Sequence, residues 1–138
     1  MPRPVVKRKN DTVKLDGLAP AGFLLISACV LAARATSLPL TITCGTEGHA
    51  PTDPHTLGEA IDLSVAGLSP SQILVIKAAL ELAISTLTDA PFTVLYETSA
   101  KPEDTRLAAV AYINSGASAP HFHLQRKRNT TYPGNVNA

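Results

Sequence analysis

The sequence predicts an α+β domain in which two main helices pack on a small, mostly antiparallel sheet. Helical signals occupy residues 20–35 and 69–87, and short runs of alternating or β-branched apolar residues lie between and after them. Short turns separate the later runs, which favours antiparallel pairing. With 138 residues, 45% of them hydrophobic, the chain is long enough to bury one core.

The first predicted helix, residues 20–35, begins with Pro20, which suits a first helical turn. It is apolar nearly all round, so we expect it to be mostly buried. Its apolar run, preceded by basic residues, also has features of a secretory signal. However, Asp11 and Asp16 interrupt the leader, and the run is far shorter than the about 20 residues that span a bilayer. We expect a buried helix and no membrane partner.

The second predicted helix has a clear start signal and one apolar stripe. Ser69 can cap it, Pro70 lies in the first turn, and Gln72 can complete a capping box. Apolar residues then recur at steps of three and four, which predicts one core-facing side. They are Ile73, Ile76, Leu80, Ile84 and Leu87.

Five short strands are predicted, over residues 40–44, 61–63, 92–96, 107–113 and 121–125. They belong to a domain over 15–126, which lies between a basic N-terminal arm without periodicity (1–14) and a polar C-terminal tail (127–138). The net charge is +1. Because no strong basic excess exists, we expect no nucleic-acid partner.

The two cysteines, Cys29 and Cys44, lie in apolar segments and fit no C-x-x-C motif. Buried thiols are the expected state, with a single disulfide as the alternative. Neither cysteine is placed like a zinc ligand.

Three of the four histidines lie in two short motifs. His55 and Asp62 are seven positions apart, and His121 and His123 alternate near the C-terminus. On one helix, seven residues would separate two side chains by about 10 Å. A tight turn entering a strand lets both converge, and residues two apart on a strand share a face. Two imidazoles and a carboxylate form an open zinc site, so the spacing predicts a metal centre.

A longer pattern contains both motifs. It runs Ile42-Thr43-Cys44-Gly45, then His55-x-x-Gly58-x-Ala60-x-Asp62-Leu63, then His121-x-His123. Together with the order of helices and strands, it resembles the zinc D-alanyl-D-alanine carboxypeptidase family. The wider group contains bacterial and phage L,D-endopeptidases and the hedgehog signalling domain. The resemblance covers roughly residues 15–125, and the loop holding His49 is most similar to small phage-encoded members.

The resemblance implies a hedgehog/D-Ala-D-Ala peptidase-like fold with zinc bound by His55, Asp62 and His123. Zinc would lower the pKa of its water to roughly 7 and polarise the scissile carbonyl of a peptidoglycan stem peptide at a D-amino acid. His121 would stabilise the oxyanion or shuttle a proton beside the ion. The resemblance further implies a phage lysis or virion-associated enzyme, made in the host cytoplasm and acting on the cell wall.

The chain departs from the family pattern at the catalytic base. Many relatives place a carboxylate three residues before the last ligand, where this sequence has Pro120. His121 is the first candidate for the base. Glu97, at the end of a neighbouring strand, is the second, and an exposed strand-end charge is the other interpretation of that residue.

A second departure concerns substrate binding. The Arg that often follows the family's Ile-Thr-Ser-Gly strand is absent from the loop 46–49, and Asp53 stands where relatives commonly have Ser. Arg106 is a candidate substitute, with a solvated arginine as the alternative. His49 is a candidate substrate contact or extra ligand.

These departures motivate a hypothesis from another class, a structural or binding virion protein that keeps the fold without turnover. In that case the two polar ends of the chain would contact virion or homo-oligomer subunits.

Overall fold

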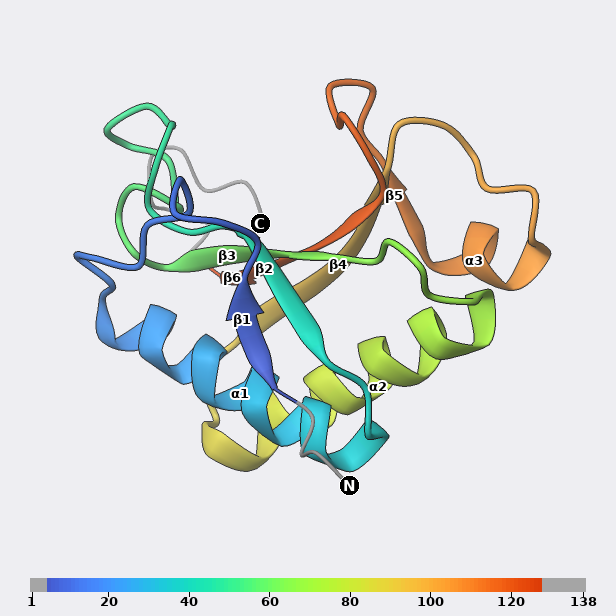
Figure 1. The fold of residues 1–138 in the computed structure, drawn as a ribbon, viewed down its shortest axis with the longest axis horizontal. Helices are drawn as coiled ribbons and strands as arrows, with labels where there is room; N and C mark the ends of the chain where they lie inside the picture. The colour runs from blue at the N-terminus through green and yellow to red at the C-terminus, as the bar shows by residue number, and fades with distance from the viewer. Residues whose placement is uncertain (1–4, 128–138) are drawn as a thin grey trace.

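The computed structural model describes residues 5–127 and has an α+β architecture (Figure 1). The expectations for residues 1–4 of the arm and 128–138 of the tail lie outside the described residues. The elements are β1 (Val6–Arg8), α1 (Pro20–Thr36), β2 (Leu40–Cys44), β3 (Ala60–Ser64), α2 (Pro70–Leu87), β4 (Phe92–Thr98), α3 (Thr105–Val110), β5 (Ala111–Ile113) and β6 (His121–Arg126).

The strands form one six-stranded sheet in the order β1-β2-β3-β6-β4-β5. The three central pairings, β2 with β3, β3 with β6 and β6 with β4, are antiparallel, as predicted. The two outer pairings, β1 with β2 and β4 with β5, are parallel. The sheet is therefore mixed.

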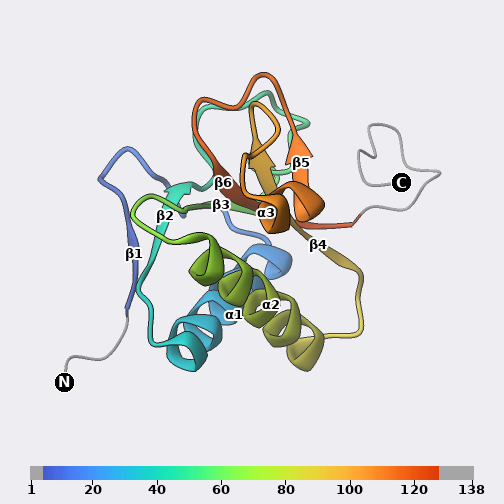
Figure 2. The ribbon, with the colours of Figure 1, turned by 90° about the vertical axis from the view of Figure 1, so that its right-hand side faces the viewer.

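Helices α1 and α2 pack side by side on one face of the sheet (Figure 1; Figure 2). The expectation of a mostly buried first helix holds for one face only. Leu25, Ala28 and Cys29 of α1 are completely buried, whereas its Phe23, Val30 and Leu31 are exposed. The largest buried side chains are Phe122, Leu25, Leu40, Ile42, Ile61, Leu63, Ile76, Leu80, Leu124, Val13 and Cys29. They join the two helices and the central strands into one core.

Helix α2 begins with the predicted capping box, in which Ser69 and Gln72 bond each other's backbone N–H. Four residues of its predicted apolar stripe pack into the core, with Ile76 and Leu80 completely buried, but the fifth, Leu87, is exposed. Among residues 5–127, α2 is the one helix that is long and apolar enough to cross a bilayer by length and composition. Core helices of soluble proteins meet the same criterion.

Two sequence expectations are wrong. Residues 107–113 do not form one strand, because Asp104 caps a short helix, α3, and only Ala111–Ile113 extend along β4. The arm is not wholly irregular either, because its Val6–Arg8 pairs with β2 as a parallel edge strand. An edge strand of three residues is too short for an alternation of apolar and polar residues to be recognised in the sequence.

The register of the central strands gathers the polar residues of both motifs. Asp62 of β3 lies opposite His123 of β6, and Glu97 of β4 lies opposite His121. Opposite residues in an antiparallel pair have Cβ atoms about 4.5–5.5 Å apart. Since His121 and His123 share a face of β6, all four side chains meet on one side of the sheet.

Candidate metal centre

Three predicted ligands converge at the centre of the sheet. Asp62 Oδ1 lies 2.8 Å from His123 Nδ1 and 3.3 Å from His55 Nε2. One ligand atom from each of the three residues lies within 4.8 Å of the others. A tetrahedral ion with bonds of about 2.0–2.2 Å would space its ligand atoms about 3.3–3.6 Å apart. The distance from Asp62 to His55 already fits such an ion, and the distance from Asp62 to His123 would have to widen by about 0.5–0.8 Å.

In His55 and His123, one ring nitrogen is hydrogen-bonded to a neighbouring residue, and this bond leaves the other nitrogen facing the ligand group. His55 Nδ1 lies 2.9 Å from Gly45 O and donates to it, which leaves the lone pair on Nε2. His123 Nε2 lies 2.8 Å from Gln125 Oε1 and donates to it, which turns Nδ1 towards Asp62. Such outer partners orient the histidine ligands of metal sites.

The charge of Asp62 and that of the imidazoles around it depend on each other. Burial alone would raise the pKa of Asp62, but its interactions with the imidazoles of His123 and His55 outweigh burial and hold that pKa well below its usual range. Burial alone would lower the pKa of His123, and the Asp62 carboxylate reverses this and raises it. The Asp62 carboxylate thus favours the protonated form of His123, a charge pattern that a divalent ion can replace.

The turn that carries His55 is fixed by tight backbone packing. Gly58 has φ +73, and a Cβ there would lie 2.5 Å from both Ala19 N and Gly17 O. Its carbonyl accepts from Ala19 N at 3.1 Å, which joins the turn to the start of α1. Asp53 Oδ1 accepts from His55 N at 2.8 Å and closes the turn. A glycine is therefore required between the two ligands.

Glu97 and His121 form a second polar pair beside the ligands. Glu97 Oε1 lies 3.2 Å from His121 Nε2, and Glu97 Oε2 accepts from Asn114 Nδ2 at 3.0 Å. The sequence left an exposed strand-end charge open as one interpretation of Glu97; the residue is instead buried, with 8% of its surface exposed. His121 Nε2 also lies 3.9 Å from Asp62 Oδ2.

This pair carries opposite charges at neutral pH. The hydrogen bond to Glu97 and the bond from Nδ1 to Ala119 O, which outweigh burial, raise the pKa of His121 to about 9. The bond from His121 and that from Asn114 lower the pKa of Glu97 against the effect of burial. His121 is thus an imidazolium and Glu97 a carboxylate.

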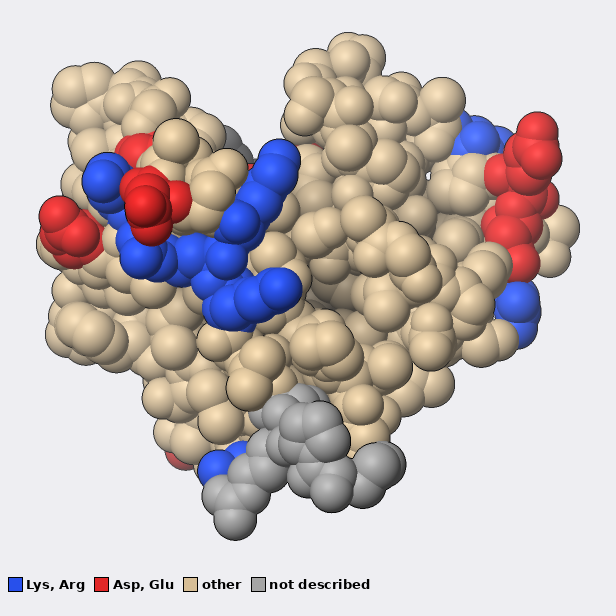
Figure 3. All heavy atoms as spheres, in the orientation of Figure 1, with Lys and Arg blue, Asp and Glu red and all other residues tan. Residues whose placement is uncertain are grey.

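A cleft of about 760 Å³ opens above these residues. Its walls come from the loop before β3 and from the loop between β5 and β6, and the molecule is visibly hollowed between these two segments (Figure 3). All three ligands, the Glu97–His121 pair, His49 and Asp53 line it. Its far wall is formed by residues 112–118.

Arg106 lies elsewhere. It is on α3, where its guanidinium donates to Ser71 Oγ at 3.1 Å and to Asp104 Oδ2 at 3.2 Å. It does not line the cleft, so the structure does not bring this candidate substrate residue to the ligands.

Cys44 lies next to the candidate ligands, although the sequence analysis did not count it among them. No disulfide joins the cysteines, as expected: both are free, Cys29 buried and Cys44 half-buried. However, Cys44 Sγ lies 3.0 Å from His49 Nε2, and Cys44, His49 and His55 form a second group that could hold a metal ion. The expectation that Cys44 is not placed like a ligand is therefore wrong.

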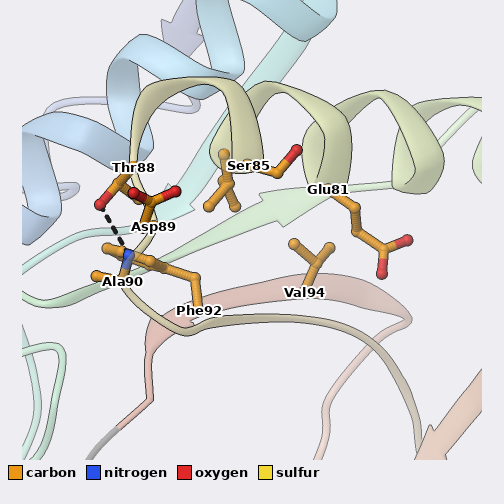
Figure 4. Close-up of a pocket in the computed structure, with 8 residues that line it drawn as sticks. Glu81, Ser85, Thr88, Asp89, Ala90, Phe92 and Val94 are labelled. Carbon is orange, nitrogen blue, oxygen red and sulfur yellow. Dashed lines mark hydrogen bonds between the residues drawn. The ribbon is translucent and has the colours of Figure 1, made fainter.

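A second hollow, of about 370 Å³, lies at the end of α2 and the start of β4 (Figure 4). Its charged lining residues are Glu81 and Asp89, and Thr88 Oγ1 there accepts from Ala90 N. It contains no histidine or cysteine, and neither group of described residues that could hold a metal ion includes a residue that lines it.

Family models, curated proteins and solved structures were each compared with the chain, and none of the three comparisons gives a match.

Proposed function

We propose that the protein is a zinc-dependent peptidase that cleaves a peptide bond in peptidoglycan stem peptides, on a hedgehog/D-Ala-D-Ala peptidase-like fold. The observation that carries the proposal is the meeting of two imidazoles and one carboxylate beside a Glu97–His121 pair in one open cleft. Two histidines and a carboxylate are the ligand set of several catalytic zinc sites. Zinc bound there supplies Lewis-acid polarisation of a carbonyl and acidifies water.

The protonation states of Glu97 and His121 suit these two residues to different catalytic roles. Glu97 is the general base in this proposal, because its carboxylate is ionised and lines the same cleft as the ligands. Its lowered pKa makes it a weak base, so the reaction needs water that the bound ion has acidified. His121 is the electrostatic partner, because an imidazolium can donate a hydrogen bond to the oxyanion that forms at the carbonyl oxygen. When the C–N bond breaks, Glu97 passes its proton to the leaving amine. His121, the first base candidate from the sequence, is less suited to that role.

The proposal covers two kinds of bond. Asp53, Asp62 and Glu97 line the cleft, but Glu97 pairs with the His121 imidazolium and a bound ion would offset Asp62. Both an endopeptidase and a carboxypeptidase are therefore compatible with the charge of the cleft. The phage lysis or virion setting rests on the sequence pattern alone.

Digestion of purified peptidoglycan tests the proposal. Wild type and His123→Ala, with zinc content measured on both, would be compared with Arg106→Ala, a variant outside the cleft. We expect stem-peptide fragments from wild type and Arg106→Ala, and loss of both zinc and fragments in His123→Ala. Parallel assays on cross-linked peptides and on peptides ending in D-Ala-D-Ala separate the endopeptidase from the carboxypeptidase. A zinc-loaded wild type that releases no fragments would leave a structural or binding role.

A further inference from the structure

Cys44 and His49 contact each other beside the first ligand group, which is His55, Asp62 and His123. Cys44 Sγ is 3.0 Å from His49 Nε2. The His49 ring stacks on the His55 ring, with centroids 4.5 Å apart and planes at 11°. One ligand atom from each of the three residues lies within 4.8 Å of the others. A single ion can therefore reach all three.

The surrounding loop holds these side chains in place. His49 Nδ1 lies 3.6 Å from Asp53 Oδ2, so the carboxylate stands behind the ring and Nε2 faces Cys44. Glu47 Oε1 accepts from Gly45 N and from Lys14 N, both at 2.9 Å, and fastens the loop to a distant segment. At 3.6 Å the carboxylate is within ion-pair range of His49 but beyond hydrogen-bond range, and a small shift of the ring would make it the usual outer partner of a metal ligand.

The order Cys44, His49, Asp53 is also that of a cysteine nucleophile with its base and orienting carboxylate. The local charge argues against that chemistry. Burial, followed by the carboxylates of Asp62 and Glu47, raises the pKa of Cys44 to about 12. A nucleophile needs a thiolate at neutral pH. A divalent cation, by contrast, is attracted by the same carboxylates and binds sulfur as thiolate.

We propose that Cys44 Sγ, His49 Nε2 and His55 Nε2 form a second ligand set, for a thiophilic divalent cation, that competes with the Asp62–His123 set for His55. The sulfur donor gives this set a preference for softer ions than the first set has. When the sulfur–metal bond forms, the thiol proton is released to solvent.

The competition follows from the tautomer of His55. Its Nδ1 donates to Gly45 O at 2.9 Å, so Nε2 holds the one free lone pair. That nitrogen also lies 3.3 Å from Asp62 Oδ1, within the first group. One lone pair binds one ion. An ion on the sulfur set therefore withdraws His55 from the first set, and it does so whether or not the protein is a peptidase.

Titration of the zinc-free full chain with Cd²⁺ and with Co²⁺ tests the proposal, with sulfur-to-metal charge-transfer absorption as the readout. Cys29→Ala is the matched control, because Cys29 is the other free cysteine and is buried within α1. We expect wild type and Cys29→Ala to develop the band and saturate at one Cd²⁺ per chain. Cys44→Ala and Cys44→Ser should lack it, and His49→Ala should bind Cd²⁺ at least about tenfold more weakly.

Three outcomes would overturn the proposal: no band in wild type, an unchanged band in folded Cys44→Ser, or two Cd²⁺ ions bound per chain with similar affinity. His123→Ala separates this inference from the proposed function, since it should keep the sulfur band while losing hydrolysis. A wild type that shows the band but cleaves no peptidoglycan would contradict the peptidase alone. His55→Ala should lose both properties.

Discussion

Glu97 Oε1 lies 3.2 Å from His121 Nε2, across a pair of opposite residues on β4 and β6. The contact sets both charges, since each group favours the ionised form of the other. The pair borders the ligands, because His121 Nε2 is also 3.9 Å from Asp62 Oδ2. A carboxylate and an imidazolium are thus held together next to the candidate metal ligands.

Glu97→Gln should lower kcat for peptidoglycan cleavage by about 10²–10⁴-fold while the zinc content stays at the wild-type level. The amide keeps the shape of the side chain but cannot accept the proton of water. Steady-state kinetics and metal analysis on the same samples measure both quantities. An unchanged kcat in Glu97→Gln would remove this residue from the base role.

The zinc-free protein should lose stability as the pH rises through about 9. The folded pKa of His121 is about 9, above the usual histidine pKa of 6.5, so its contribution is complete below pH 6.5 and lost above the folded pKa. The magnitude is roughly 1–3 kcal/mol. Urea unfolding at pH 6 and pH 10 measures the loss, and Glu97→Gln should reduce it. NMR titration of His121 should show a lower pKa in that variant; an equal pKa in both proteins would contradict the assigned partner.

The candidate ligands His55, Asp62 and His123 could be predicted from the sequence for two reasons. Strand periodicity places His121 and His123 on one face, and a turn that contains a glycine brings His55 near Asp62. Glu97 was harder, because β4 continues two residues beyond the expected Tyr96 and so pairs Glu97 with His121. The extension depends on the partner strand, which local propensity does not contain.

The Cys44–His49 contact could not be predicted from spacing. It depends on a loop that Glu47 fastens to Lys14, 33 residues away in the chain. Helix α3 was missed for a different reason: it is six residues long and only Leu107 in it is buried, so no helical stripe develops. The Asp104 cap was the one signal that could have identified it.

Gln125→Leu should weaken zinc binding by about 10–100-fold. Gln125 Oε1 accepts from His123 Nε2 at 2.8 Å, and without that acceptor the ring no longer has a fixed tautomer or orientation. Gln125→Glu is the matched control, because it retains the acceptor and should bind zinc at least as well as wild type. Competition with a chromophoric chelator measures the affinities. Equal affinity in Gln125→Leu and wild type would show that His123 is oriented by other contacts.

Gly58→Ala should destabilise the protein more than Gly67→Ala, although both glycines have positive φ, +73 and +78. At Gly67 a Cβ meets nothing within 4 Å, so the cost is the left-handed conformation alone, about 1–2 kcal/mol. At Gly58 the Cβ would lie 2.5 Å from the backbone atoms Ala19 N and Gly17 O, which cannot move aside as a flexible side chain would. We expect an additional loss of roughly 2 kcal/mol or more, measured by denaturant unfolding. Zinc affinity should fall in Gly58→Ala only, because relief of the clash displaces the turn that carries His55. Equal losses in the two variants would mean that the turn can move away from α1 without strain, and that Gly58 does not fix the distance between His55 and Asp62.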